Sequence, residues 1–331
     1  MGHQRIRIGI SSCLLGERVR YDGNHKRDAR INDVLSEHFK FVPYCPEVAI
    51  GLGVPRATLR LQQTGHGVRA VQPDRNLRDV TEALAAYGRR IGRSDTRISG
   101  YIFKARSPSC GPARVKVYDA NGSPSGKAEG IYAAALMQTQ PLLPAEDEGR
   151  LNDPDLRDNF IERVFVYHRW QLLAAEGITA AGLVKFHAEH TFLIMAHSQA
   201  ALRELGRMTA NLKRNLAGTA ESYVQRLMQS LSRPAKRGNQ VNALEHVAGS
   251  FKRALDAHDR KELQNAIEGY RNEDLPIIVP LTLIRHHMRR NPDACLQGQR
   301  FVEAGPKGLD IRRRRGVPPS PPPRSHGREK D

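Results

Sequence analysis

The chain has 331 residues, a formal net charge of +17 and a hydrophobic fraction of 39%. This length favours two domains over one. No apolar stretch approaches the roughly 20 residues that a membrane span needs, and the charged start MGHQRIRIGISSC is unlike a secretory signal. We therefore expect a cytoplasmic protein without a membrane partner, and the positive charge makes nucleic acid the first polyanion to consider.

Strands and helices alternate in the first half. Short runs rich in apolar and β-branched residues predict strands at residues 5–11, 40–45 and 98–105. Apolar residues at helical spacing predict helices between them, at residues 28–39 and 79–93, and a turn-rich loop and a short helix follow. Such alternation is typical of an α/β layer with a mostly parallel sheet, so we expect an α/β domain over residues 1–145.

The second half has a different character. A proline-rich and acidic segment at residues 139–155 carries no clear period and predicts a boundary. Beyond it, amphipathic segments of helical spacing follow one another and predict six or seven helices, which form an all-helical domain over residues 155–305. The end of the chain, residues 306–331, is basic and then rich in proline, which predicts a disordered tail.

The four cysteines are not scattered at random. Cys13 directly follows the first predicted strand, Cys45 ends the second, and Cys110 lies a few residues past the third, whereas Cys295 belongs to the helical half and is treated as unrelated. Ligands of parallel α/β sheets bind beyond the carboxyl ends of the strands. Three cysteines at such positions are therefore predicted to converge on one site, which is assembled by the fold and not by a local CxxC motif.

The donor set favours a metal. A lone buried cysteine is usually a small hydrophobic residue, but three at equivalent strand ends indicate a shared site. In a reducing compartment such thiols are structural, catalytic or metal-binding and not disulfide-linked. Three thiolates suit a zinc ion or a [4Fe–4S] cluster in which one iron lacks a protein thiolate, and the spacing does not choose between them.

Three segments of the first half resemble the bacterial thiouracil desulfidase (TudS) family. They are IGISSCLLGERVRYDGNHKRD, CPEVAIGLGVPR and ARSPSCG, and they preserve the order and context of the cysteines. The second half, with KFHAEHTFLIMAHS and VPLTLIRHHMRR, resembles a helical companion domain of uncharacterised function. The pairing of the two halves is similar to the YbgA-type two-domain proteins.

The resemblance implies a cofactor and a reaction. Cys13, Cys45 and Cys110 would hold a [4Fe–4S] cluster with one iron not ligated by a protein thiolate. That iron would accept the sulfur of a thiolated pyrimidine, which is a thiouracil-like base, a nucleotide or a tRNA-derived group. Water would replace the sulfur at the ring carbon, so the expected activity is a hydrolytic desulfuration without net oxidation.

Three further residues are candidates for the chemistry. Substitution at a thiocarbonyl needs a group that moves protons and activates water, and Glu47, two residues after Cys45, is the predicted acid–base residue. Ser107 is predicted to orient water or the ring, and Asp22 to accept a ring N–H. Each of the last two also has a structural interpretation, because Asp22 before Gly23 is a common turn signature and Ser107 before a proline suits a cap or turn.

Other polar residues are interpreted as structural. His187, His190 and His197 share one face of a predicted helix, and only the first two lie near enough along its axis to bind one metal. Satisfied core histidines or a polar contact surface is the preferred interpretation. Arg56 in GLGVPR would suit the phosphate of a nucleotide, but it is interpreted as a surface arginine.

Two alternative functions remain open. The first is a nucleic-acid-associated binding protein whose three cysteines hold a structural metal. Beside a desulfidase, the basic helical half would also suit a docking module that delivers thiolated nucleotides or tRNA to the cluster, with the RRRR run at residues 312–315 attracting phosphates, although no recognisable RNA motif is present. The second is a hydrolase with a cysteine nucleophile, for which His25 or His66 would have to supply the base.

Overall fold

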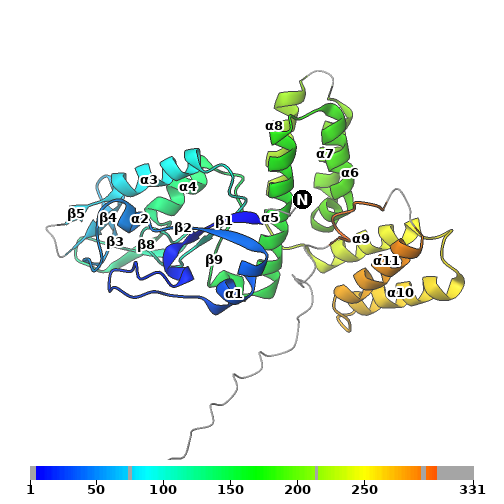
Figure 1. Ribbon diagram of the computed structural model, residues 1–331, viewed down its shortest axis with the longest axis horizontal. Helices are drawn as coiled ribbons and strands as arrows, with labels where there is room; N and C mark the ends of the chain where they lie inside the picture. Colours follow the sequence, from blue (N-terminus) through cyan, green and yellow to red (C-terminus); the bar gives the residue numbers. More distant parts are fainter. Residues whose placement is uncertain (1–4, 74–76, 213–214, 292–295, 304–331) are drawn as a thin grey trace, which may run out of the picture.

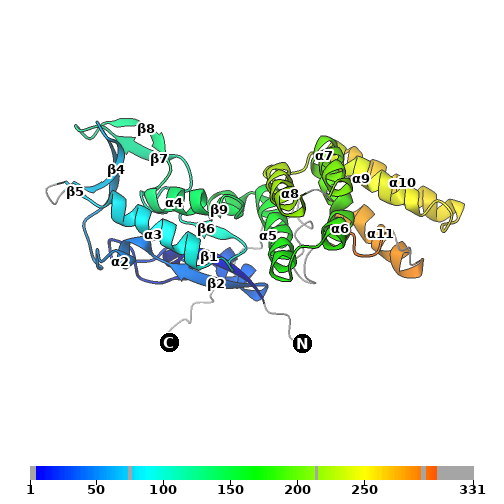
Figure 2. The same ribbon diagram turned by 90° about the horizontal axis from the view of Figure 1, so that it is seen from above.

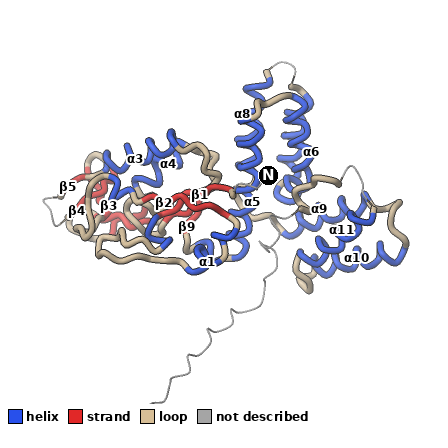
Figure 3. Tube along the Cα trace, viewed as in Figure 1, coloured by secondary structure: helices blue, strands red, loops and turns tan. Residues whose placement is uncertain are grey.

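The computed structural model describes residues 5–73, 77–212, 215–291 and 296–303 (Figure 1). Every strand of the described chain lies in the first half, and the second half consists of helices (Figure 3). The predicted fold class, an α/β half followed by an all-helical half, is therefore confirmed. The predicted disordered tail at residues 306–331 and Cys295 lie outside the described residues.

A four-stranded sheet, sheet A, organises the first half. Its strands in spatial order are β2 (Phe39–Tyr44), β1 (Ile6–Ser11), β6 (Tyr101–Phe103) and β9 (Ala145–Asp147). All three pairings in sheet A are parallel. The strand β9 falls within the segment predicted to be a boundary, because three residues are too few to show a strand period.

The side chains of sheet A alternate between two cores. Ile8 and Ile10 of β1 pack with α1 (Ala29–Asp33) and α5 (Pro154–Ala175) on one face. Tyr101 and Phe103 of β6 point to the other face, where they pack against α3 (Thr81–Ser94) and α4 (Ile131–Thr139). This alternation follows from the two-residue period of a strand, and the coverage of both faces is typical of a parallel sheet.

A second sheet, sheet B, is not foreseen from the sequence. Its strands in spatial order are β5 (Arg78–Asp79), β4 (Gly67–Gln72), β3 (Arg60–Thr64), β7 (Val115–Tyr118) and β8 (Pro124–Ala128). Three of its pairings are antiparallel and one is parallel. The strand β8 lies in the stretch predicted to be a turn-rich loop, since its residues PSGKA are mostly exposed and have no apolar alternation.

Short helical segments complete the first half. The predicted helix at residues 28–39 is two pieces, α1 and the 3-10 turn η2 (Leu35–Glu37). A further 3-10 turn, η3 (Arg150–Asn152), precedes α5.

The helical half follows the predicted segments closely. Its helices after α5 are α6 (Ala180–His197), α7 (Gln199–Ala210), α8 (Leu216–Ser230), α9 (Arg237–Ser250), α10 (Ala257–Arg271) and α11 (Ile278–Arg290). Side chains of Thr179, Ser198, Asn215 and Asp256 cap four of them by accepting backbone N–H bonds. None of the described helices is long and apolar enough to span a bilayer.

Helix α5 lies between the two halves and belongs to both cores (Figure 2). Phe160 and Val164 pack under sheet A, whereas Trp170 packs into the core of the helical half. Gln171 of α5 also receives a hydrogen bond from Ser99 at 2.7 Å and donates to the carbonyl of Ile98 at 3.0 Å. The division into domains at residues 1–145 and 155–305 stays a prediction, because α5 contributes to both cores.

Candidate metal centre

Three cysteines follow three neighbouring parallel strands. Cys13 lies in the 3-10 turn η1 (Ser12–Leu15) after β1, and Cys45 is the N-cap residue of the short helix α2 (Pro46–Ala49) after β2. Cys110 lies in the turn that follows β6. All three are free thiols, with Cys13 and Cys110 buried and Cys45 partly buried. Since β1 pairs with both β2 and β6, the carboxyl ends of the three strands meet at one edge of sheet A.

The thiols are near enough to influence one another. Burial raises the pKa of Cys13 to about 11, a value that the neighbouring Cys45 helps to raise and the cation of Lys104 opposes. Burial also raises the pKa of Cys45 and Cys110. The charges of Cys45 and Cys13 also raise the pKa of Cys110. Without a cationic ligand the three groups therefore remain protonated at neutral pH, and a bound metal would displace those protons.

Hydrogen-bond donors lie around the sulfur atoms. The hydroxyl of Ser109 lies 3.7 Å from Sγ of Cys110, and a hydrogen bond from Ser11 lowers the pKa of the same thiol. Backbone N–H groups of Val48 and Glu47 lower the pKa of Cys45 in the same way. These donors would stabilise thiolates at the site.

Ser107 builds the turn that carries Cys110. Its hydroxyl oxygen accepts hydrogen bonds from the backbone N–H groups of Ser109 at 3.3 Å and Cys110 at 3.1 Å. The turn packs closely against the start of α4, since a Cβ at Gly130 would lie 2.7 Å from the carbonyl oxygen of Ser109 and a Cβ at Gly111 would lie 2.5 Å from Val115. Ser107 therefore has the turn-forming role that the sequence left open, and its hydroxyl also lies 3.0 Å from that of Ser109.

Glu47 lies inside this group of residues. One carboxylate oxygen accepts a hydrogen bond from Ser109 at 2.5 Å, and the other accepts one from Arg56 at 2.8 Å. The interpretation of Arg56 as a surface arginine is wrong, since its side chain is only 4% exposed. Arg56 also donates to the carbonyl of Val19 at 2.8 Å, so it ties the loop after β1 to the loop after β2.

Asp22 lies in an exposed turn. Its carboxylate accepts hydrogen bonds from Arg20 at 3.2 Å and from the backbone N–H of Asn24 at 3.1 Å, which is the geometry of a turn. The hydrogen bond from Arg20 lowers the pKa of Asp22 to about 2. Arg20 in turn lowers the pKa of Cys13, so Asp22 is connected to the site through its arginine partner.

Two charged residues at the site escaped the sequence analysis. Lys104 follows β6 directly and forms a close ion pair with Glu148. Glu148 also accepts a hydrogen bond from the backbone N–H of Ala105 at 2.6 Å, which fixes the exit of β6. The sequence could have indicated Lys104, because it directly follows the apolar run YIF and a residue at a strand exit lies on the ligand side of a parallel sheet.

The arrangement of the sulfur atoms bears on the kind of metal. The three cysteine sulfur atoms do not all lie within 4.8 Å of one another. Among the described residues, the ligand atoms that do so belong to His258, Asp259 and Glu262. A tetrahedral zinc ion with Zn–S bonds of about 2.3 Å would bring its sulfur ligands to about 3.8 Å from one another. The three cysteine thiols do not form such a compact group, and cations and hydrogen-bond donors surround them, so they fit an iron–sulfur cluster better than a single ion.

The histidines do not form a common site. In the described chain His187 contacts the hydroxyl of Tyr223 at 3.0 Å, and buried His190 donates to the carbonyl of Phe186 at 2.7 Å. His197 contacts Glu162 at 2.5 Å. Each histidine thus has its own partner in the helical core, as the structural interpretation predicts.

The hydrolase alternative depended on a nearby base. His25 and His66 are both exposed. No hydrogen bond between either histidine and a cysteine is present in the described part of the chain, and the nitrogen Nδ1 of His25 instead accepts one from the backbone of Arg27 at 3.1 Å. The geometry therefore does not support a cysteine nucleophile with one of these bases.

Comparison with known proteins identifies both halves. The fold and the cysteine set define an α/β domain with three cysteines at its strand ends, joined to a helical domain. The family model described as 2-thiouracil desulfurase matches residues 8–148, and that of a protein of unknown function (DUF1722) matches residues 192–306. The chain belongs to the 2-thiouracil desulfurase family through its first half and to the DUF1722 family through its second, which indicates an enzyme related to the desulfidases.

Individual relatives each match about half of the chain. Protein YbgA of Escherichia coli (strain K12), described as uncharacterised, is 34% identical over 157 residues, which cover 47% of this chain and 93% of YbgA. Protein YbbK of Bacillus subtilis (strain 168), also described as uncharacterised, is 34% identical over 160 residues, which cover 44% of this chain and 98% of YbbK. A solved structure, the [4Fe-4S]-dependent thiouracil desulfidase TudS, is 29% identical with a TM-score of 0.34, covering 45% of this chain and 94% of its own.

Proposed function

We propose that this protein is an iron–sulfur desulfidase that removes sulfur from a thiolated pyrimidine, either a free base or one within a nucleotide or tRNA. Cys13, Cys45 and Cys110 would hold a [4Fe–4S] cluster with one iron not ligated by a protein thiolate. The observation that carries the proposal is the convergence of three thiols, two of them buried and one partly buried, beside a carboxylate and a cation at the strand ends. Membership of the 2-thiouracil desulfurase family supports the reaction class.

The overall reaction consumes one water molecule. The carbon–sulfur double bond of the substrate is replaced by a carbon–oxygen double bond, and the sulfur leaves with both protons of the water as hydrogen sulfide. No electrons are gained or lost overall. The cluster, when bound, would supply a Lewis-acidic iron that can accept the substrate sulfur.

The protein residues would supply the proton transfers. Glu47 lies beside Cys110 and is held by Arg56, so it is the candidate to remove a proton from the attacking water and return it to the departing sulfur. Ser107, with Ser109, offers hydroxyl groups that can orient water or the ring. Asp22 is proposed to accept a ring N–H, and its contact with Arg20 keeps it ionised for that role.

The helical half is proposed to dock the substrate carrier. Its location beside sheet A, fixed by α5, places a second folded surface next to the α/β half. The net charge of +17 favours a polyanionic carrier such as RNA or a nucleotide. We propose the cytoplasm as the place of action, because the thiols remain reduced there.

The proposal is tested by purifying the protein without oxygen. We expect a brown protein that contains about four iron and four sulfide ions per chain. It should then release sulfide from 2-thiouracil or from a thiouridine monophosphate, followed as loss of thiocarbonyl absorbance. A colourless protein that binds zinc and stays colourless after reconstitution would contradict the proposal, and it would favour the structural-metal alternative.

A further inference from the structure

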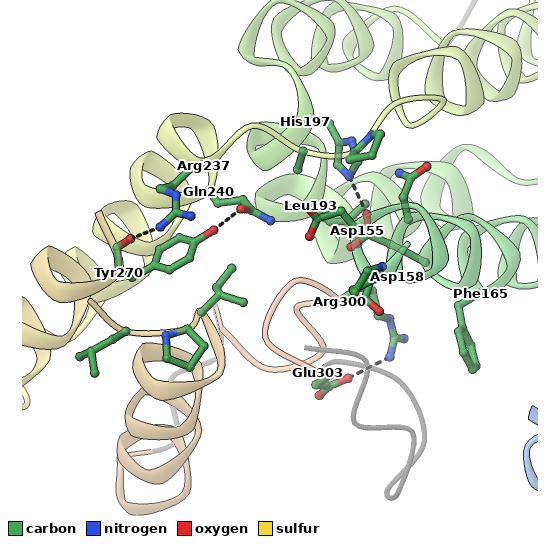
Figure 4. Close-up of a pocket in the computed structure, with 18 of the residues that line it drawn as sticks. Asp155, Asp158, Phe165, Leu193, His197, Arg237, Gln240, Tyr270, Arg300 and Glu303 are labelled. Carbon is green, nitrogen blue, oxygen red and sulfur yellow. Dashed lines mark hydrogen bonds and ion pairs between the residues drawn. The ribbon is translucent and has the colours of Figure 1, made fainter. Parts of the chain in front are cut away.

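A cavity of about 340 Å³ lies in the helical half (Figure 4). Its wall is formed by one face of α5, the end of α6, the start of α9, the connection between α10 and α11, and residues 300–303. None of the residues of the candidate metal centre lines it. The cavity is therefore a second place in the protein where a small molecule could bind, and its volume falls in the usual range of ligand pockets.

Most charged groups of the wall already have partners. Three contacts join cationic and acidic side chains, which are His197 with Glu162 at 2.5 Å, Arg237 with Glu273 at 3.1 Å, and Arg300 with Glu303 at 3.0 Å. Figure 4 shows His197 at one side of the cavity and Arg237 beside Tyr270 at another. These contacts give the groups concerned partners within the protein.

Arg169 differs from the other arginines of the wall. Within the ranges that the structure describes, no hydrogen bond or ion pair joins its side chain to another residue, and its guanidinium carbon lies 5.7 Å from the ring centroid of Phe165. Burial, together with the nearby guanidinium of Arg300, lowers the pKa of Arg169 to about 10. Nearby carboxylates act in the opposite direction, but Glu189 and Glu303 are engaged by Arg300.

The donors of Arg169 are available to a ligand in the cavity. Arg169 is partly buried, so its guanidinium group keeps only part of its contact with water, and no acceptor among the described protein residues replaces the rest. The guanidinium group of Arg169 has donors in a planar fork that match carboxylate or phosphate oxygens. An oxyanion beside Arg169 would supply the acceptor that these donors lack.

Two of the acidic residues of the wall lie at a distance from Arg169. Asp155 and Asp158 also line the wall, at the start of α5. A helix rises 1.5 Å per residue, so Asp158 and Arg169 are about 16 Å apart along the axis. An anion at Arg169 would therefore not lie against these carboxylates.

We propose that this cavity binds the oxyanion group of a small molecule, a phosphate monoester or a carboxylate, through Arg169 with Arg300 beside it. The site lies in the half that matches a family of unknown function. It does not depend on the cluster or on the desulfidase reaction. The helical half would thus bind a small molecule in addition to docking the substrate carrier.

The test is isothermal titration calorimetry on the full chain at fixed ionic strength. Sodium phosphate, uridine monophosphate and malate are titrated separately, so that a phosphate source and a carboxylate source are distinguished. We expect saturable binding of at least one of them with one site per chain. Arg169→Gln should weaken that binding at least tenfold.

A matched variant separates the cavity from general charge attraction. Arg93→Gln removes the same charge from the exposed surface of α3 and should bind the probe as the parent does. Saturable binding of none of the three probes, or equal loss in Arg93→Gln and Arg169→Gln, would overturn the proposal.

A second readout covers the case in which Arg169→Gln does not fold. Arg169→Lys keeps the charge without the planar fork and should weaken the same probe several-fold. At the same concentration, the probe should also raise the thermal midpoint of the parent chain more than that of Arg169→Lys. An equal rise in both proteins would count against binding through Arg169.

Discussion

The carboxylate of Glu47 accepts a hydrogen bond of 2.5 Å from the hydroxyl of Ser109, although 62 positions separate the two residues in the chain. Ser109 is fully buried, and its hydroxyl also contacts the sulfur of Cys110. Arg56 holds the other oxygen of Glu47 and reaches back to the loop after β1. One network of hydrogen bonds therefore connects the loops that carry all three cysteines, and it can be tested residue by residue.

Replacing Cys45 should abolish assembly of the cluster. Cys45 is one of only three thiols at the strand ends and is the most exposed of them, so Cys45→Ala removes a ligand with little loss of core packing. We expect the variant to keep the far-ultraviolet circular dichroism of the parent and to lose most of its iron and acid-labile sulfide after anaerobic reconstitution. Iron content equal to that of the parent would exclude the three-cysteine site.

Glu47→Gln should keep the cluster and lose turnover. The carbonyl oxygen of glutamine still accepts the hydrogen bond of Arg56, and its NH2 group can donate to the hydroxyl of Ser109, but glutamine cannot take up a proton at neutral pH. General acid–base catalysis contributes about a hundredfold or more, so we expect at least that loss in the rate of sulfide release. The control is Glu82→Gln on the exposed side of α3, which should turn over like the parent. If Glu47→Gln retains the visible spectrum and the full rate on every accepted substrate, the acid–base role is wrong.

Arg56→Met should destabilise the protein through the carboxylate that it leaves behind. The side chains of Arg56 and Glu47 are only 4% and 15% exposed, and an uncompensated buried charge costs about 3 kcal/mol. The measurement is urea unfolding of the cluster-free protein. Arg89→Met breaks an ion pair with Glu82 at the surface and should change stability by less than about 1 kcal/mol. Similar losses in both variants would show that burial does not set the strength of the Arg56 contact.

The buried imidazole of His190 should lower the free energy of unfolding as the pH falls. Burial lowers the pKa of His190 from 6.5 to about 3, so the unfolded chain takes up a proton below pH 6.5 that the folded chain does not. Stability is therefore full above pH 6.5 and is lost as the pH falls toward 3. One such proton changes the free energy of unfolding by about 1.4 kcal/mol per pH unit.

The slope is measured by urea unfolding at pH 7, 6 and 5. His190→Gln should reduce the slope by the contribution of one proton, about 1.4 kcal/mol per pH unit. Glutamine can still donate to the carbonyl of Phe186 but does not titrate. An unaltered slope in His190→Gln would exclude a buried neutral imidazole at this position.

Much of the fold is predictable from local patterns. The helices of the second half appear in the sequence because each buries one face, and α6 (Ala180–His197) coincides with the predicted segment. The strands β1 and β2 are visible because their apolar residues are continuous or alternate over six positions. The strands β8 and β9 are not, since β8 is mostly exposed and β9 is three residues long. Short strands obtain their pairing from neighbours that are distant in the chain, which a local pattern does not record.

The candidate site was predictable in part. The positions of Cys13, Cys45 and Cys110 after predicted strands were enough to expect their convergence, because parallel strands end at one edge of a sheet. The burial of Arg56 and the contact of Ser109 with Glu47 were not predictable. Both depend on the packing of loops against each other, and a local sequence pattern does not show which loop residues face inward.

By itself, the sequence determined the division into an α/β half and a helical half, the order of the cysteines on their strands and the family of each half. These features depend on periodicity and on short motifs, which are local properties of the chain. Only the tertiary structure decided that Arg56 is buried against Glu47, that α5 contributes to both cores and that Arg169 lines a cavity in the helical half. These features arise where distant segments exclude water from one another, and burial of that kind is a property of the folded chain.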